Sequence, residues 1–444
     1  MSNDTPPPAT PTFEGDGDTV PPTIRVAHTS DWHLGYEAYQ ARTTGGHNQR
    51  GADLVKAAAQ VVEDIVVWDP ELVVIAGDSA DKPNGVAFKY LIQIRKLLSQ
   101  LATVRSDGSR RQVVLLSGNH DQPRNRREVC FLELFAGAPG VHVVTTSYER
   151  VSFPDTGASA GRPELLADVV VHALPHDELK TVEWQAVRPE PGKVNILSAH
   201  GVAGGSELYV RALGREFAIP TEVLKLKWDY GALGHWHKRT PVNDRVWYCG
   251  SPENVSFRDL RDNGTRRGYL RVTVHPGDLP EVAEVDLPIR SMFRLPVVDA
   301  AELEPDQIEA ALVERIDAAE LHGAVVGQIV EGVTRDRWSL VDVARVRRHA
   351  SAALSYDITC RFDNAPTARE GTSAVGADLG SVGPLMEERA KVLFKQYVED
   401  TVELAASLVD QELATRGDVD EVAEPTTSAP AHDAGLEPAR EGAA

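Results

Sequence analysis

Five short segments of this 444-residue chain carry side chains that can bind metal ions. Each segment follows a run of apolar residues, and its polar side chains are aspartate, histidine or asparagine. The seven candidate ligands are Asp31, His33, Asp78, Asn119, His200, His235 and His237. Carboxylate, imidazole and carboxamide groups without a thiolate suit Mn²⁺, Fe or Zn²⁺ better than a soft metal. Seven ligands are too many for one tetrahedral ion, so the set predicts two ions that share one carboxylate, an arrangement suited to phosphoryl chemistry.

Each segment taken alone has an ordinary structural explanation. A Gly-Asp pair is usually a turn, and a single histidine at the end of a strand is usually a core or surface residue. The five segments together favour a site. The remaining histidines lack this context, so we expect His28, His142 and His172 to be core residues. We expect solvent exposure for His47, His176, His275, His322, His349 and His432.

Strands and helices must bring these distant segments together. Apolar runs typical of buried strands occur at 24–29, 72–76, 113–116, 169–173, 194–199, 231–233, 246–248, 269–274 and 282–287. Amphipathic patterns at 52–67 and 88–101 predict helices between the early strands. This order predicts an α/β fold, a layered α/β sandwich. Residues that follow the carboxyl ends of neighbouring strands share one sheet edge, so all five segments can converge there.

The pattern changes after residue 290. Predicted strands at 293–298, 325–333 and 353–362 alternate with predicted helices at 305–321 and 340–350, which suits a small α+β domain over 291–363. Residues 364–383 are rich in Gly, Ala, Ser and Thr and predict a linker. Pro384 begins a predicted amphipathic helix over 384–415. Residues 1–22 and 416–444 have few apolar residues and predict disorder.

Charge and composition limit the class of protein. The chain has 46 basic and 66 acidic residues and a net charge of −20, which excludes a protein that coats nucleic acid with a uniformly basic surface. Residues 1–22 and 416–444 contribute nine of the 20 excess negative charges. A local basic groove is therefore still compatible with the net charge of the chain. The three cysteines form no CxxC pair, and we find no signal peptide or membrane-spanning run. We therefore expect a cytoplasmic protein.

The five segments resemble the signature of the calcineurin-like metallophosphoesterase superfamily, which reads D-x-H, GD, GNH[D/E], H and GHxH. They stand here as Asp31-x-His33, Gly77-Asp78, Gly118-Asn119-His120-Asp121, His200 and Gly234-His235-Trp236-His237. The flanking residues 28–35, 115–121, 232–238 and 248–252 are similar to the SbcD family, the nuclease subunit of the SbcC–SbcD DNA repair complex. The resemblance covers residues 23–290 well and implies a layered α-β-β-α sandwich for them. It weakens over 291–370, where the family carries a capping domain. Over 384–415 only the arrangement of predicted elements is similar, not the sequence.

The resemblance implies a role for each candidate residue. Asp31, His33, Asp78 and His237 would hold one Mn²⁺, and Asp78, Asn119, His200 and His235 the other, with Mg²⁺, Fe or Zn²⁺ as alternative metals. His120 would face the scissile phosphate. The implied activity is that of a Mn-dependent 3′–5′ exonuclease and endonuclease on double-stranded DNA ends or hairpins. The implied partner is an SMC-like ATPase of the SbcC type, and the nuclease would be a homodimer.

Three questions stay open at this point. Arg124, Arg126 and Arg127 follow the GNHD segment and are candidates for DNA binding, although such clusters are usually solvated surface. Helix 384–415 could dock on the partner or fold back on its own core. A phosphoesterase for nucleotides or phosphoproteins, and a non-catalytic scaffold, are alternative functions for the same fold.

Overall fold

A computed structural model describes residues 23–39, 43, 45–82, 86–123, 125, 128–153, 166–205, 217–260 and 266–363. The predicted linker 364–383, the predicted helix 384–415 and the terminal segments 1–22 and 416–444 lie outside the described residues. Arg124, Arg126 and Arg127 also lie outside them.

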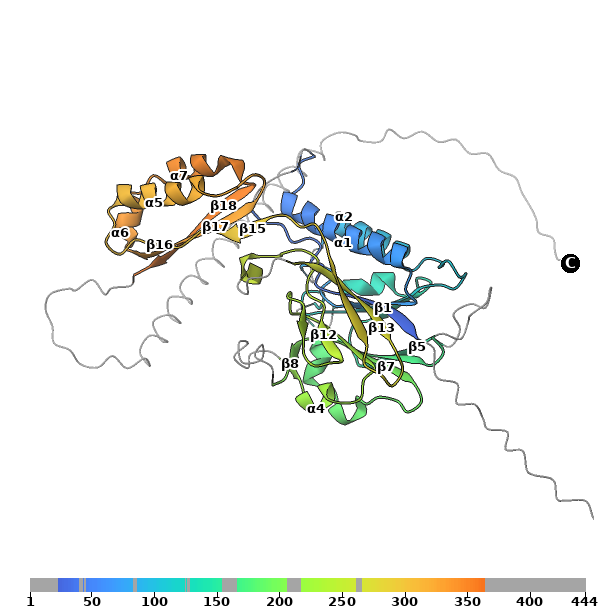
Figure 1. The fold of residues 1–444 in the computed structure, drawn as a ribbon. Helices are drawn as coiled ribbons and strands as arrows, with labels where there is room; N and C mark the ends of the chain where they lie inside the picture. The colour runs from blue at the N-terminus through green and yellow to red at the C-terminus, as the bar shows by residue number, and fades with distance from the viewer. Residues whose placement is uncertain are drawn as a thin grey trace, which may run out of the picture. The chain divides into compact units, whose positions relative to one another are not determined.

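Two six-stranded sheets form the larger part of the structure (Figure 1). The first has the order β14-β13-β1-β2-β3-β4, in which β1 to β4 are parallel and β13 and β14 are antiparallel additions. Its strands are β1 (Ile24–Thr29), β2 (Leu72–Ala76), β3 (Gln112–Leu116), β4 (Val141–Val144), β13 (Gly268–Val274) and β14 (Glu281–Asp286).

The second sheet has the order β11-β12-β10-β7-β6-β5, with β12, β10, β7 and β6 parallel to one another. Its strands are β5 (Glu149–Ser152), β6 (Val169–Leu174), β7 (Val194–His200), β10 (Tyr230–Gly234), β11 (Thr240–Pro241) and β12 (Val246–Tyr248). Two short strands, β8 (Val202–Ala203) and β9 (Ala218–Ile219), pair beside it.

Three apolar layers hold these elements together. The core between the two sheets includes Val26, Val74 and Val114 from the first sheet and Val171 and Ile196 from the second. Helices α1 (Gln49–Trp68) and α2 (Phe88–Leu101) cover the outer face of the first sheet. Helix α4 (Thr221–Leu224) and the turns η2 (His176–Lys180) and η3 (Trp184–Ala186) cover the second. The predicted α-β-β-α sandwich is confirmed.

A four-stranded sheet follows these layers along the chain. Its central strand β17 (Val325–Val333) pairs in parallel with β15 (Met292–Arg294) and β16 (Val298–Asp299) on one side and with β18 (Ser355–Phe362) on the other. It packs against α5 (Pro305–Asp317), α6 (Arg335–Ser339) and α7 (Val343–His349). This small sheet belongs to the same compact unit as the larger sheets, so the predicted domain boundary near residue 290 stays a prediction.

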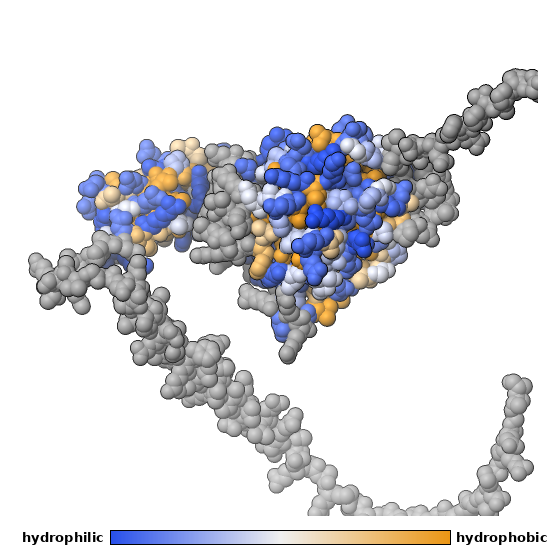
Figure 2. Space-filling view, turned by 90° about the horizontal axis from the view of Figure 1, so that it is seen from below, coloured by the Kyte–Doolittle hydropathy of each residue, from blue (hydrophilic) through white to orange (hydrophobic). Residues whose placement is uncertain are grey.

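Two predicted elements of this region have different bounds in the structure. The strand predicted at 293–298 is two short strands, β15 and β16, because Pro296 between them has no N–H to continue the ladder. The helix predicted at 340–350 is α7 alone, preceded by α6. Hydrophilic and apolar side chains are interspersed on the face that Figure 2 shows. Among the described residues, no helix has the length and hydropathy needed to cross a membrane.

Candidate metal centre

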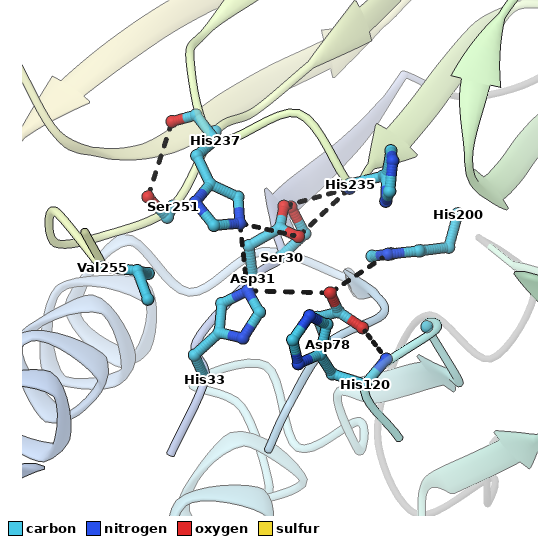
Figure 3. Close-up of polar contacts among 12 residues, drawn as sticks. Ser30, Asp31, His33, Asp78, His120, His200, His235, His237, Ser251 and Val255 are labelled. Atoms are coloured by element: carbon cyan, nitrogen blue, oxygen red, sulfur yellow. Dashed lines mark hydrogen bonds and ion pairs between the residues drawn. The ribbon is translucent and has the colours of Figure 1, made fainter. Parts of the chain in front are cut away.

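The predicted ligands meet where the two sheets face each other. Asp31 and His33 follow β1, Asp78 follows β2, and Asn119 follows β3, which are parallel neighbours in the first sheet. His200 ends β7 and His235 follows β10, which are parallel neighbours in the second sheet. Figure 3 shows the side chains of Asp31, His33, Asp78, His200 and His237 pointing toward one another.

The backbone at four of these positions is left-handed. The φ angles are 54° at Asp31, 47° at His33, 54° at Asp78 and 95° at His235. Such a conformation is uncommon for residues other than glycine and is typically maintained by the surrounding structure at functional sites. Here Asp31 N donates to Gly77 O at 3.0 Å, and His33 N donates to Asp78 O at 3.0 Å. These bonds join the loops after β1 and β2 directly.

One group of donors gathers around His33. Its Nε2 lies 3.0 Å from His237 Nε2 and 3.6 Å from Asp78 Oδ2. His237 Nε2 lies 3.9 Å from Asp31 Oδ1. Asp31, His33 and Asp78 are at most 2% exposed. These distances bring together the four residues predicted to share the first metal ion.

A second group of donors gathers around His200. Its Nε2 lies 3.3 Å from Asp78 Oδ2 and 3.1 Å from Asn119 Oδ1. His235 Nδ1 lies 3.0 Å from the same Asn119 oxygen. Asp78 Oδ2 is therefore close to both groups, as expected for a carboxylate that two ions share.

Second partners fix the orientation of two histidines. His200 Nδ1 donates to Ala76 O at 2.7 Å, and His237 Nδ1 donates to Asp259 Oδ1 at 3.0 Å. Each bond turns the Nε2 atom of the ring toward the other candidate ligands, an orientation common in metal-binding histidines. Asp31 accepts from Ser30 Oγ and from His235 N, the latter at 3.1 Å.

The donor set fits divalent metal ions. His33 Nδ1 is buried without a hydrogen-bond partner, and the Nε2 atoms of His33 and His237 face each other among carboxylates. Burial lowers the pKa of His33 well below its ordinary value, so its imidazole is neutral at pH 7. Burial alone would raise the pKa of Asp78, but the charge and the hydrogen bond of His200 hold it well below its ordinary value. A neutral imidazole and an ionised carboxylate are the forms that bind metals.

His120 lies beside these groups without belonging to either. Its backbone N–H donates to Asp78 Oδ1 at 2.8 Å, and its Nδ1 donates to Asp81 O at 2.7 Å. Its ring centroid is 4.7 Å from that of His33, and its side chain is 42% exposed. The imidazole is therefore accessible to a substrate next to the centre. His33, Asp81 and His120 also form a group of potential metal ligands.

Sequence reasoning missed two residues of this site. His176, predicted to be exposed, is partly buried: its Nδ1 donates to His200 O at 3.2 Å, and its ring lies 5.9 Å from that of His235. That prediction was wrong, although His176 also follows an apolar run, Val169–Leu174, with Pro175 between them. Asp259 had no comparable signal because no strand precedes it. His28 and His172 are fully buried, as predicted, whereas His142 is only partly buried. His275, predicted to be exposed, is also partly buried.

Comparison with known proteins bears on this centre. The calcineurin-like phosphoesterase family profile matches residues 24–239. The chain contains a calcineurin-like phosphoesterase domain. That domain includes all seven predicted ligands and His120, and it confirms the predicted enzyme class, a phosphoester hydrolase.

Several curated proteins are similar over a longer stretch. The D component of the nuclease SbcCD from Bacillus subtilis is 26% identical over 288 residues, which cover 57% of this chain and 67% of that protein. The protein of the same name from Escherichia coli K12 is 24% identical over 296 residues, covering 60% and 69%. The DNA double-strand break repair protein Mre11 of Methanosarcina acetivorans is 26% identical over 306 residues, covering 66% of this chain and only 44% of the relative.

Proposed function

We propose that this chain is a Mn²⁺-dependent DNA nuclease that cleaves phosphodiester bonds at double-stranded ends or hairpins. The observation that carries the proposal is the position of Asp78 Oδ2, within 3.6 Å of His33 Nε2 and 3.3 Å of His200 Nε2. A carboxylate in this position can serve two metal ions at once. The names of the similar nucleases and repair proteins favour DNA as the substrate.

The protein's own residues have separate tasks in this proposal. Asp31, His33 and His237 bind one ion, Asn119, His200 and His235 bind the other, and Asp78 is shared. Bound divalent ions would supply an activated water molecule and stabilise negative charge in an in-line displacement at phosphorus.

His120 acts on the substrate rather than on the metals. Its Nδ1 is engaged by Asp81 O, so its Nε2 is the atom available to a phosphate oxygen. From that position it can orient the phosphate and donate a proton to the leaving oxygen. General-acid help of this kind contributes about 10²–10⁴-fold to a rate.

The partners of this activity are also part of the proposal. Because similar proteins are named as components of the nuclease SbcCD, an SMC-like ATPase is the expected partner, with residues 384–415 as its docking helix and 291–363 as a capping domain. Arg124, Arg126 and Arg127, which follow the GNHD segment in the sequence, would bind DNA phosphates. The proposed nuclease is a homodimer that acts at the nucleoid in the cytoplasm.

The test is digestion of end-labelled linear duplex DNA by the purified full-length chain with Mn²⁺ or Mg²⁺. A small phosphodiester serves as a second substrate, and Asp78→Ala serves as the inactive control. We expect metal-dependent shortening of the DNA that the control lacks. Hydrolysis of the small phosphodiester without DNA cleavage would refute the nuclease and favour a nucleotide or phosphoprotein substrate. Metal binding without hydrolysis of either substrate would favour a scaffold.

A further inference from the structure

The short turn η4 (Phe257–Leu260) touches both the metal centre and the small sheet. Two of its side chains lie two positions apart and face different neighbours. Asp259 contacts His237, and Phe257 contacts the small sheet at β15 and β17. The turn therefore connects a predicted metal ligand to a part of the protein that contributes no predicted ligand.

Asp259 is held by both of its carboxylate oxygens. Oδ1 accepts the 3.0 Å hydrogen bond from His237 Nδ1, while Oδ2 accepts from Val255 N at 2.7 Å and Ser256 N at 2.9 Å. Its side chain is only 8% exposed. A carboxylate with no free rotation fixes the ring of His237 and keeps Nε2 toward Asp31 and His33.

Arg267 joins the turn to the loop that carries His237. Its guanidinium donates to Asp259 O at 3.1 Å and to the carbonyl oxygen of His237. Its Nε also donates to Asn254 Oδ1 at 2.8 Å. Arg267 is 2% exposed, so these bonds do not compete with water. The turn and the backbone of His237 therefore behave as one unit.

Phe257 is seated against the small sheet. Gly327 of β17 approaches so closely that a Cβ there would lie 2.9 Å from Phe257 Cε1. The guanidinium carbon of Arg294, in β15, lies 4.8 Å from the ring centroid, within the range of a cation–π contact. Tyr39 packs edge-on at 5.9 Å. The small sheet thus determines where the ring can lie.

We propose that Asp259 is a positioning residue for His237, and that η4 transmits the position of the small sheet to this ligand through Phe257. Metal–ligand distances tolerate a change of only about 0.2 Å. A small displacement of the sheet therefore changes metal affinity at one of the two ions, the one that His237 binds. This inference rests on the proposed metal centre but not on the choice of substrate.

The test measures Mn²⁺ binding to the purified full-length chain by calorimetry, without any substrate. Asp259→Ala should weaken one of the two binding events about 10–100-fold and leave the other unchanged, as loss of a histidine's second partner does. Phe257→Ala should weaken the same event, although Phe257 is not a predicted ligand and its ring packs against Gly327, Arg294 and Tyr39. Arg258→Ala, exposed on the same turn, is the matched control and should bind as the native chain does.

A double variant tests whether both residues act on one path. If Phe257 acts through Asp259, Asp259→Ala/Phe257→Ala binds Mn²⁺ as weakly as Asp259→Ala alone, because the two losses do not add. Fully additive losses, or native affinity in either single variant, would overturn the proposal. Melting of the metal-free proteins identifies a folding defect, in which case Asp259→Asn and Phe257→Leu replace the alanine variants. A native chain that binds no Mn²⁺ would instead refute the metal centre itself.

Discussion

Replacing Gly118 by alanine should weaken the binding of both metal ions, because the added methyl group would occupy the space of the shared carboxylate. A Cβ at this position would lie 2.1 Å from Asp78 Oδ1 and 2.5 Å from Asp78 N. Real Cβ atoms essentially never approach another heavy atom within 3.0 Å, so the carboxylate oxygen must move by about 0.9 Å. The contact with the backbone nitrogen means that a side-chain rotation alone cannot relieve the clash.

The size of this displacement sets the expected loss. It is more than four times the tolerance of about 0.2 Å in a metal–ligand distance. A misplacement of about 1 Å in an active site can reduce a rate about 10²-fold. Since Asp78 Oδ2 serves both groups of donors, we expect at least about 100-fold weaker Mn²⁺ binding at both sites and a comparable loss of phosphodiester cleavage.

The assay is calorimetric titration of Mn²⁺ into Gly118→Ala, with cleavage of a small phosphodiester as the second measurement. Gly45→Ala is the matched control, because its nearest neighbour would be 3.6 Å from the new Cβ and its φ is not left-handed. Melting of the metal-free proteins separates a local defect from unfolding. If Gly118→Ala folds and binds both ions with native affinity, then the packing of Gly118 against Asp78 does not hold this carboxylate in place.

Three further variants test other parts of the proposal. His120→Ala should keep native Mn²⁺ occupancy but lose about 10²–10⁴-fold in cleavage rate, and loss of the metal instead would make His120 a ligand. Asp53→Asn should lower the free energy of unfolding by about 1.5–3 kcal/mol at pH 7, because it weakens the charged bonds to Arg290. Burial alone would raise the pKa of Asp53, but the Arg290 bond lowers it below its ordinary 3.8. The stabilisation by Asp53 is present above about pH 4 and is lost as the pH falls. The native and Asp53→Asn proteins should therefore differ less in their free energy of unfolding at pH 3 than at pH 7. An equal difference at both pH values would refute the ionic contribution. Removing residues 384–444 should leave DNA cleavage but abolish co-purification with an SMC-like ATPase, whereas undiminished co-purification would refute the docking helix.

Most strands of the two large sheets could be predicted from apolar runs in the sequence, including β14, which is largely exposed, but β4 was not predicted. The bounds of β1, β2, β12 and α2 agree with the prediction, and the apolar runs of β1 and β2 end sharply at Ser30 and Gly77. Strand β5 was not predicted, because Glu149, Arg150 and Ser152 are exposed and no alternation marks it. A short edge strand of this kind forms by pairing with β6 and not from its own pattern.

The convergence of the ligands could be predicted for a topological reason. Neighbouring parallel strands end at one edge, so Asp31, Asp78 and Asn119 had to lie close together once β1, β2 and β3 paired. The packing of the two sheets against each other could not be predicted in the same way. The placement of His200 and His235 opposite them depends on how two sheets pack, which no local pattern encodes. The same holds for His176 and Asp259, whose roles arise from tertiary contacts alone.

The ligands on the two sheets are coupled to different degrees. Within the first sheet, Asp121 accepts hydrogen bonds from Ser79 N and Gly118 N, at 3.2 and 3.0 Å, so the loops after β2 and β3 are joined through one carboxylate. Between the sheets, the bonds of the centre include His235 N to Asp31 Oδ1 at 3.1 Å and His200 Nδ1 to Ala76 O at 2.7 Å. His237 depends in addition on η4. Ligands of the first sheet therefore form the rigid half of the centre, and His237 is the ligand whose position the rest of the protein can adjust.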